Sequence, residues 1–279
     1  MGSGQDAALA AGRNTFMVTD TDQIRRAFSQ DGFVILRSAY GLSMIEELES
    51  LVSDTARSWN LARGKPTAGG DVYDDLAFLE ENDPDAFYKL GTFIGTSVAG
   101  LRLAMSPKIT DAISLVSETP ATRLFCNNPT MFYNDPKVPR LQYRWHQEST
   151  YQTDYRHALH TWSPLFRDIG LEDGPMLVKR GAMAQTFPCK YEKRNRGFTQ
   201  LFIEDEDIKQ FETVPCVLNR GDAVLFQHRL VHCTGQNRSG RARINMIVRY
   251  FDALAESVFE PVLVYHSRVA HLNSKEAKN

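Results

Sequence analysis

The spacing of apolar positions along the chain changes near residue 121. Before that point, apolar residues recur every three or four positions, which is the period of a helix with one buried face. A short apolar, β-branched run at 33–37 interrupts this region and predicts a strand. The predicted helices cover a segment that begins after Asp20 and ends at Gly32, a second segment at 43–59, and a third at 84–118 that is broken near Pro107.

After residue 121 the chain consists of short aromatic and β-branched runs separated by turn signals, a pattern that predicts strands. The sequences "GLEDG" at 170–174 and "NRGD" at 219–222 are predicted hairpin-type turns between such runs. The Gly- and Asp-rich segment 60–83 is predicted as a loop that covers a site. The predicted strands cover 122–127, 130–134, 141–151, 157–167, 175–180, 213–218, 222–233 and 242–251.

A helical lead-in followed by many short strands predicts a mainly β fold with flanking helices. The expected architecture is a double-stranded β-helix, the cupin-like jelly roll, with N-terminal α-helices packed on the outer sheet. A length of 279 residues suits one such domain. We expect a flexible N-terminus over 1–19, a single jelly-roll domain over 20–255 and a C-terminal extension over 256–279.

The composition narrows the class of partner. With 42% hydrophobic residues, 24% charged residues and a formal net charge of -2, the chain has the profile of a globular domain. Nucleic acid is not an expected partner because the chain lacks a strong basic excess. No apolar run is long enough to span a membrane. A small-molecule substrate is therefore the expected partner, and the sequence indicates no oligomeric state.

The four cysteines are scattered and form no CxxC pair, so the sequence predicts neither a zinc ribbon nor a disulfide framework. This usage fits a cytoplasmic protein.

The candidate chemistry begins at "RWHQEST", residues 144–150. On a strand, His146 and Glu148 would project from the same face because side chains alternate. A second histidine, His232, ends the predicted apolar strand within "GDAVLFQHRLVHCTG". Two histidines and one carboxylate form a facial triad, which suits Fe(II) and leaves open positions for substrate and dioxygen. Zinc would favour a closed tetrahedral site instead.

The last predicted strand, "RARINMIVRY", places Arg243, Asn245 and Arg249 on one face. An inward arginine needs a partner, and its planar guanidinium matches a carboxylate through two hydrogen bonds. Since no acidic residue lies nearby on the same strand, a small dicarboxylate cosubstrate is the predicted partner of Arg243. Thr234 is a candidate donor to the same carboxylate.

These motifs together resemble a known family. His146-x-Glu148, the His232 segment, and Arg243 eleven residues after His232 are similar to the phytanoyl-CoA dioxygenase-like branch of the Fe(II)/2-oxoglutarate oxygenases. The opening "FSQDGFVILRSAYGLSMIEELESL" is also similar, so the resemblance covers about residues 20–252.

The resemblance implies that Fe(II) is bound by His146, Glu148 and His232. It implies that 2-oxoglutarate is held by Arg243 and Thr234, in a pocket lined by Tyr143 and Asn128.

The activity implied by the resemblance is hydroxylation of a small molecule by O2, with release of succinate and CO2. Desaturation, epimerisation and cyclisation at the same centre remain alternatives, as does a jelly-roll binding module without catalysis. Glu148 stands where the family usually has Asp, and its extra methylene changes how the carboxylate reaches a metal. Because a carboxylate is present at all, halogenation is disfavoured.

Other polar residues have structural interpretations. His228 is predicted to pack in a strand or to support the metal ligands, and His160 to pack in the core, with substrate contact as the alternative. Arg249 is predicted to form a structural ion pair. The basic run at 190–196 is predicted as a solvated loop, with an anionic substrate as the alternative. Trp162 is predicted to belong to the core.

Overall fold

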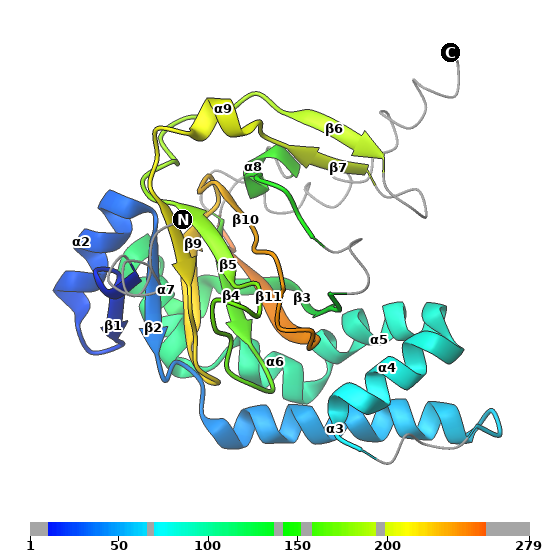
Figure 1. The fold of residues 1–279 in the computed structure, drawn as a ribbon. Coiled ribbons are helices and arrows are strands. Elements are labelled where there is room, and N and C mark those ends of the chain that lie inside the picture. Colours follow the sequence, from blue (N-terminus) through cyan, green and yellow to red (C-terminus); the bar gives the residue numbers. More distant parts are fainter. Residues whose placement is uncertain (1–10, 66–69, 137–141, 152–157, 194–198, 255–279) are drawn as a thin grey trace.

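The computed structural model describes residues 11–65, 70–136, 142–151, 158–193 and 199–254 (Figure 1). This part of the chain is a mixed α/β structure, because helices fill much of the chain before residue 118 and most of the regular elements after it are strands. Its strands form three sheets that do not close into one barrel within the described ranges. The complete jelly roll expected from the sequence therefore stays a prediction.

The largest sheet has six strands in the order β1-β2-β9-β4-β11-β3. The second sheet has the order β10-β5-β8, and β6 and β7 form a separate pair. The strands of the large sheet are β1 (Thr15–Met17), β2 (Phe33–Arg37), β9 (Ala223–Gln227), β4 (Leu159–Pro164), β11 (Arg243–Asp252) and β3 (Leu124–Asn134). The other strands are β10 (His232–Thr234), β5 (Met176–Lys179), β8 (Thr213–Cys216), β6 (Lys190–Lys193) and β7 (Thr199–Phe202).

Helices precede most of the strands in the chain. Gly32 ends the first described helix in the left-handed conformation, with φ 84°, as the sequence predicts. None of the described helices is long and apolar enough to cross a membrane. The helices are α2 (Thr21–Asp31), α3 (Leu42–Leu61), α4 (Val72–Asn82), α5 (Pro84–Thr96), α6 (Val98–Ala104), α7 (Pro107–Ser117), the 3-10 turn η1 (Ala121–Arg123), α8 (Glu148–Tyr151) and α9 (Asp205–Ile208).

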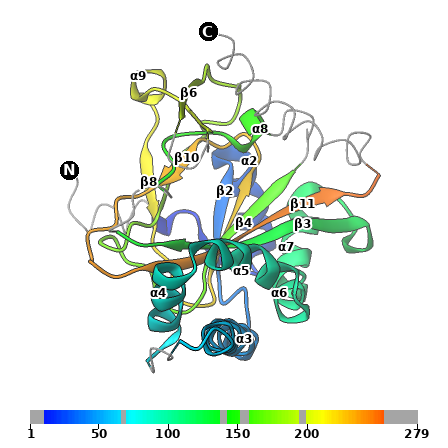
Figure 2. The ribbon, with the colours of Figure 1, turned by 90° about the vertical axis from the view of Figure 1, so that its right-hand side faces the viewer.

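The large sheet lies between two layers. Alternate residues of β11, including Ile244, Met246 and Val248, belong to the core shared with the helices, and Figure 2 shows α3 to α6 gathered on that side. Ile247 packs on the opposite face, against the core between the two sheets. This alternation means that Arg243 and Arg249, at odd positions like Ile247, share the face turned towards the small sheet.

Helix α5 packs closely on β3 because two glycines face the strand. A Cβ on Gly91 would lie 2.7 Å from the Met131 carbonyl oxygen, and a Cβ on Gly95 only 1.6 Å from that of Pro129. The pairing of β3 with β11 shifts register beside Pro129, where β3 contains one extra residue. Proline has no N–H to donate to the ladder, which accounts for an irregularity at this point.

The segment 60–83 is not the predicted loop, because α4 occupies its second half. Asp71 and Asp74 form a reciprocal capping box at its start. Val72, Leu76 and Leu79 are buried at helical spacing, and α4 packs on α3 and α5. The polar residues that suggested a loop are therefore the cap and the solvent face of a helix.

The strand predictions need four corrections. The runs predicted at 122–127 and 130–134 form one strand, β3. Among the described residues 142–151, the one β-bridge is the isolated bridge at His146, and α8 follows it. The predicted strand 222–233 is two strands, β9 and β10, so His232 begins a strand rather than ending one. Part of the expected loop 190–196 belongs to the β6–β7 pair, whose β6 residues are all exposed and so lack an apolar signal.

The two predicted hairpin turns are real turns, but the strands on either side of each belong to different sheets. The segment 170–174 connects β4 to β5, and 219–222 connects β8 to β9. The segment 1–19 contributes β1, which pairs in parallel with β2.

Candidate metal centre

The centre forms where two distant segments cross. His146 and His232 are joined by an isolated antiparallel bridge, with each backbone N–H donating to the carbonyl of the other, at 2.9 and 3.0 Å. Their ring centroids lie 4.2 Å apart. The bridge places both imidazoles on one side although 85 residues separate them in the chain (146 to 232 leaves 147–231 between).

Glu148 reaches the same point from the first residue of α8 rather than from a strand. The intervening Gln147 is fully buried and holds the segment in place. Its side-chain amide donates to the carbonyls of Gln185 and Arg229, at 2.9 and 2.6 Å. The Gln147 side-chain oxygen Oε1 accepts a hydrogen bond from the backbone N–H of Phe187 at 3.0 Å. These three hydrogen bonds fix the position of this segment, which has no strand ladder to hold it.

The three side chains present convergent ligand atoms. One atom from each of His146, Glu148 and His232 lies within 4.8 Å of the others, and all three residues are buried. Glu148 Oε1 is 3.8 Å from Nε2 of each histidine. This is the cluster predicted from the sequence.

The histidine tautomers follow from their hydrogen bonds. His146 Nδ1 lies 2.7 Å from the carbonyl oxygen of Arg144, and His232 Nδ1 lies 2.9 Å from that of Leu230. A carbonyl can only accept, so each Nδ1 carries the proton and donates it. Each Nε2 lone pair is then available on the side that faces Glu148, as a metal ligand requires.

The electrostatics suit the same role. Burial and the neighbouring His146 lower the pKa of His232 to about 3, so its imidazole is neutral at pH 7. Burial raises the pKa of the Glu148 carboxyl, but the neighbouring Arg249 charge acts in the opposite direction, and this pKa lies well below its usual value. Neutral imidazoles and an ionised carboxylate are the forms that bind a divalent cation.

Arg243 is buried, with 3% exposure, and lies on the inward face of β11. Its Nη1 donates to the carbonyl of Gly174 at 2.6 Å, while its Nε has no hydrogen-bond partner among the described residues. Burial, and then the nearby Arg167 charge, lower its pKa to about 10, although Asp173 acts in the opposite direction. A buried guanidinium without a direct carboxylate partner fits an anionic ligand.

Two other predicted cosubstrate residues lie beside the triad. Thr234 follows His232 by two residues on β10, and its backbone N–H donates to the Tyr143 carbonyl at 2.9 Å. The Tyr143 ring lies 5.6 Å from the His146 ring. Asn128 belongs to β3, but its side chain lies outside the described part of the structure.

The other polar predictions have clear outcomes. His160 and His228 are both buried, and their Nε2 and Nδ1 atoms lie 3.0 Å apart, so they form a packed pair. Arg249 forms an ion pair, as predicted, and its partner is Glu148. The Arg243 guanidinium carbon lies 5.2 Å from the Trp162 ring centroid, and Trp162 belongs to the core between the sheets.

Two contributors were missed by sequence reasoning. Nothing in the pattern marks Gln147 as a clamp, because its three partners lie far away in the chain. The pairing of Arg249 with Glu148 is also invisible locally, although the alternation of β11 places Arg249 on the inward face.

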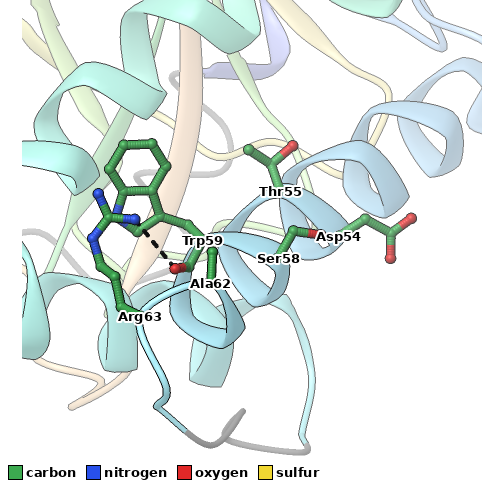
Figure 3. Close-up of a pocket in the computed structure, with 6 residues that line it drawn as sticks. All are labelled: Asp54, Thr55, Ser58, Trp59, Ala62 and Arg63. Carbon is green, nitrogen blue, oxygen red and sulfur yellow. Dashed lines mark hydrogen bonds between the residues drawn. The ribbon is translucent and has the colours of Figure 1, made fainter.

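A separate hollow lies on the outer face of α3 and contains none of these residues (Figure 3). Its Arg63 guanidinium stacks 3.7 Å from the Trp59 ring centroid, and both side chains contact Asp83. The hollow is lined by Asp54, Thr55, Ser58, Trp59, Ala62 and Arg63.

Comparison with protein families shows which family the chain belongs to. The family model described as "Phytanoyl-CoA dioxygenase (PhyH)" matches residues 28–245, a span that includes the triad and Arg243. The chain belongs to the PhyH family. Membership makes it an Fe(II)- and 2-oxoglutarate-dependent oxidoreductase. Comparison with curated proteins gives no sequence match.

Solved structures of similar fold accompany this PhyH assignment. The epimerase SnoN, solved with Fe3+, alpha ketoglutarate and nogalamycin RO, is 17% identical with a TM-score of 0.59, over 84% of each chain. EvdO2 from Micromonospora carbonacea var. aurantiaca is 19% identical with a TM-score of 0.58, over 83% of this chain and 90% of its own. The carbocyclase SnoK from nogalamycin biosynthesis is 14% identical with a TM-score of 0.57, over 86% and 87%. At these identities the likeness is one of fold.

Proposed function

We propose that this PhyH-family protein hydroxylates a small organic molecule with Fe(II), 2-oxoglutarate and O2. One oxygen atom enters the substrate as a hydroxyl group, and the other enters succinate as 2-oxoglutarate loses CO2. The observation that carries the proposal is the buried convergence of His146, Glu148 and His232 on one point. Two histidines and one carboxylate leave coordination positions open for a keto acid and O2 at Fe(II), and membership of the PhyH family favours iron at this donor set.

Each residue of the triad has a distinct task. His146 and His232 donate Nε2 lone pairs, with the ring orientation set by their Nδ1–H bonds to backbone carbonyls. Glu148 supplies a carboxylate oxygen and one negative charge. When bound, iron supplies the redox chemistry that couples decarboxylation of 2-oxoglutarate to oxidation of a substrate C–H bond.

Arg243 is the proposed anchor for the distal carboxylate of 2-oxoglutarate. Its burial and its unpartnered Nε support this role, since the charge lacks a direct carboxylate partner among the described residues. Thr234 is proposed to donate its hydroxyl to the same carboxylate, and Tyr143 and Asn128 to line the pocket. The anchor orients the cosubstrate.

A second candidate for the reaction is a change to the substrate that adds no oxygen atom. SnoN is an epimerase and SnoK a carbocyclase, and both have the fold of this chain. Epimerisation, cyclisation or desaturation would use the same residues and differ only after hydrogen abstraction. Product analysis separates them, because hydroxylation alone adds one oxygen atom to the substrate mass.

The structural context of the proposal is a single cytoplasmic domain. We place the oxygenase domain at 20–255 and propose that the two packed sheets belong to a double-stranded β-helix. The core between the sheets, with Phe33, Trp162 and Val178, supports this architecture because it joins both sheets in one layer.

The test uses the purified full-length protein without oxygen. Addition of Fe(II) and 2-oxoglutarate is expected to give the weak visible charge-transfer band of a chelated keto acid. His232→Ala is expected to abolish the band, while Gln236→Ala, at an exposed position in the following loop, keeps it. A parent protein that gives no band, or a His232→Ala variant that retains it, refutes the proposal.

Turnover distinguishes an enzyme from a binding module. A metabolite screen with O2, read out as succinate release above the substrate-free rate, is expected to identify substrates. A module that only binds metal would form the anaerobic complex but consume no oxygen with any small molecule tested.

A further inference from the structure

The two oxygens of the Glu148 carboxylate face different partners. Oε1 points to the histidines and lies 3.8 Å from each Nε2. Oε2 faces the Arg249 guanidinium, at 3.4 Å from Nε and 3.3 Å from Nη2. The two oxygens therefore have different surroundings: Oε1 faces the histidines at the candidate metal position, and Oε2 contacts the Arg249 guanidinium.

The backbone around Arg249 fixes where its guanidinium lies. Arg249 pairs with His160 of β4 on one side and with Asn127 of β3 on the other, so β11 is held by both neighbours at this position. The register shift between β3 and β11 falls immediately before it, between Ile247 and Arg249. Irregularities of this kind re-aim the side chains beside them. The Arg249 side chain is 18% exposed and that of Glu148 9%, so water competes little for the contact.

Glutamate makes such a contact useful. Its terminal torsion is broad, so an unrestrained Glu148 carboxylate could rotate and chelate a metal through both oxygens. Two imidazoles and one oxygen leave three octahedral positions open, which is enough for a bidentate keto acid and O2. Chelation by both oxygens would leave two, and the keto acid alone would fill them.

We propose that Arg249 is a positioning residue that holds Glu148 Oε2 and restricts the carboxylate to coordination through Oε1 alone. The inference rests on the proposed function, and it assigns to Arg249 the task of keeping one coordination position free for O2.

Two other roles fit Arg249 less well. It is not the anchor of the cosubstrate, because its Nε and Nη2 already face Glu148. On the same strand face, Arg243 has an Nε without a hydrogen-bond partner in the ranges that the structure describes. Charge neutralisation alone does not need two guanidinium nitrogens on one oxygen, and a lysine would provide it equally. Replacement by lysine therefore separates position from charge.

The test measures nitric oxide as a probe of the O2 position. The full-length protein is loaded with Fe(II) and 2-oxoglutarate without oxygen, and nitric oxide binding is titrated by the EPR signal of the high-spin iron–nitrosyl adduct. Arg249→Met is expected to weaken nitric oxide binding at least tenfold while the keto-acid band persists. Its Fe(II) affinity is expected to fall about 10-fold to 100-fold, the usual effect of losing a group that orients a metal ligand. Arg238→Met, at an exposed arginine, is the matched control.

The coupling between the two residues is the decisive readout. Glu148→Asp withdraws the carboxylate by about one bond length, ~1.5 Å, which breaks its contact with Arg249. In the Glu148→Asp background, Arg249→Met is expected to change nitric oxide affinity less than about threefold. The contact that Arg249→Met removes is already absent there, so the two effects do not add. Arg249→Lys in the parent background is expected to give an intermediate affinity.

The outcomes separate the two hypotheses. If the parent forms no keto-acid complex, both the proposed function and the role of Arg249 are wrong. If the parent forms the complex and its nitrosyl adduct, but Arg249→Met binds nitric oxide as the parent does, only the role of Arg249 is wrong. The role of Arg249 is also wrong if Arg249→Met lowers nitric oxide affinity as much in the Glu148→Asp background as in the parent. It is wrong as well if Arg249→Lys binds nitric oxide with the affinity of the parent. Should Arg249→Met fail to fold, Arg249→Lys and Glu148→Asp decide the question.

Discussion

Replacement of Arg243 by methionine should move stability and cosubstrate affinity in opposite directions. Arg243 is 3% exposed and has no direct carboxylate partner among the described residues, so the metal-free, cosubstrate-free protein contains a buried cation that is poorly compensated. Methionine fills a similar volume without a charge. If the charge of Arg243 serves to bind a ligand, its removal should stabilise the protein without ligand and weaken ligand binding.

The magnitude follows from the pKa of Arg243. Burial and the neighbouring Arg167 lower this pKa from 12.5 to about 10, a difference of roughly 2.5 units. At about 1.4 kcal/mol per unit, the charged form is destabilised by about 3 kcal/mol in the empty site. The loss of the Gly174 hydrogen bond, about 1 to 2 kcal/mol, opposes this gain. Arg243→Met should therefore raise the free energy of unfolding by about 1 to 2 kcal/mol.

Cosubstrate affinity should fall sharply in the same variant. Breaking a buried charge pair costs about 3 to 5 kcal/mol, which corresponds to about a hundredfold to a few thousandfold in Kd. The assay is urea unfolding of the empty protein, together with calorimetric titration of 2-oxoglutarate into the Co(II)-loaded protein. Arg243→Lys retains the charge without the planar donor pair and should bind 2-oxoglutarate with intermediate affinity.

Two results would refute this reasoning. A loss of more than about 2 kcal/mol in the unfolding free energy of empty Arg243→Met would mean that the guanidinium is already well paired. Unchanged 2-oxoglutarate affinity in a folded variant would mean that another group anchors the cosubstrate.

Three further predictions concern the frame around the centre. Gly95→Ala should destabilise the protein by about 1 to 3 kcal/mol in urea unfolding, because the new Cβ would lie 1.6 Å from the Pro129 carbonyl oxygen; Thr92→Ala, exposed on the same helix, should not. Gln147→Leu should cost about 3 kcal/mol and weaken Co(II) binding, since it leaves three backbone groups unpaired, whereas the exposed Gln210→Leu should do neither. For His232, the pKa is about 3 when folded and 6.5 when unfolded, so the unfolded chain takes up the proton first as pH falls. The stability of the metal-free protein should thus be complete above pH 6.5 and decline towards pH 3, with about 2 kcal/mol lost by pH 5; His232→Gln should remove this part of the slope, and an unchanged slope would contradict the assignment.

Elements whose burial follows a local period were predictable from the sequence. Helix α3 and strand β2 bury their apolar residues at the spacing that the sequence displays. Helix α4 was missed because its buried residues are few and its polar cap resembles a turn. The β6–β7 pair was missed because β6 is exposed at every position, so its pairing leaves no periodic signal.

The convergence of His146, Glu148 and His232 was predicted correctly from residue types and resemblance, although one step of the structural reasoning was wrong. Alternation along a strand does not bring His146 and Glu148 together, because Glu148 belongs to α8. Their convergence depends on the His146–His232 bridge and on the Gln147 clamp, both of which join segments far apart in the chain. No local pattern encodes such contacts, so the ligand set was predictable but its support was not.

The inward face of β11 carries two arginines in different electrostatic surroundings. Arg243 and Arg249 are six residues apart on this face, with Arg243 3% exposed and the Arg249 side chain 18% exposed. Of these two arginines, Arg249 is the one that contacts Glu148, so its positive charge is neutralised by a carboxylate of the protein. Arg243 instead faces a backbone carbonyl, and its Nε finds no hydrogen-bond partner in the described part of the chain. A buried cation that the fold leaves uncompensated is unfavourable unless a ligand completes it. The same strand therefore contains an arginine that is paired with a carboxylate of the protein and an arginine for which the proposed partner is an anionic cosubstrate.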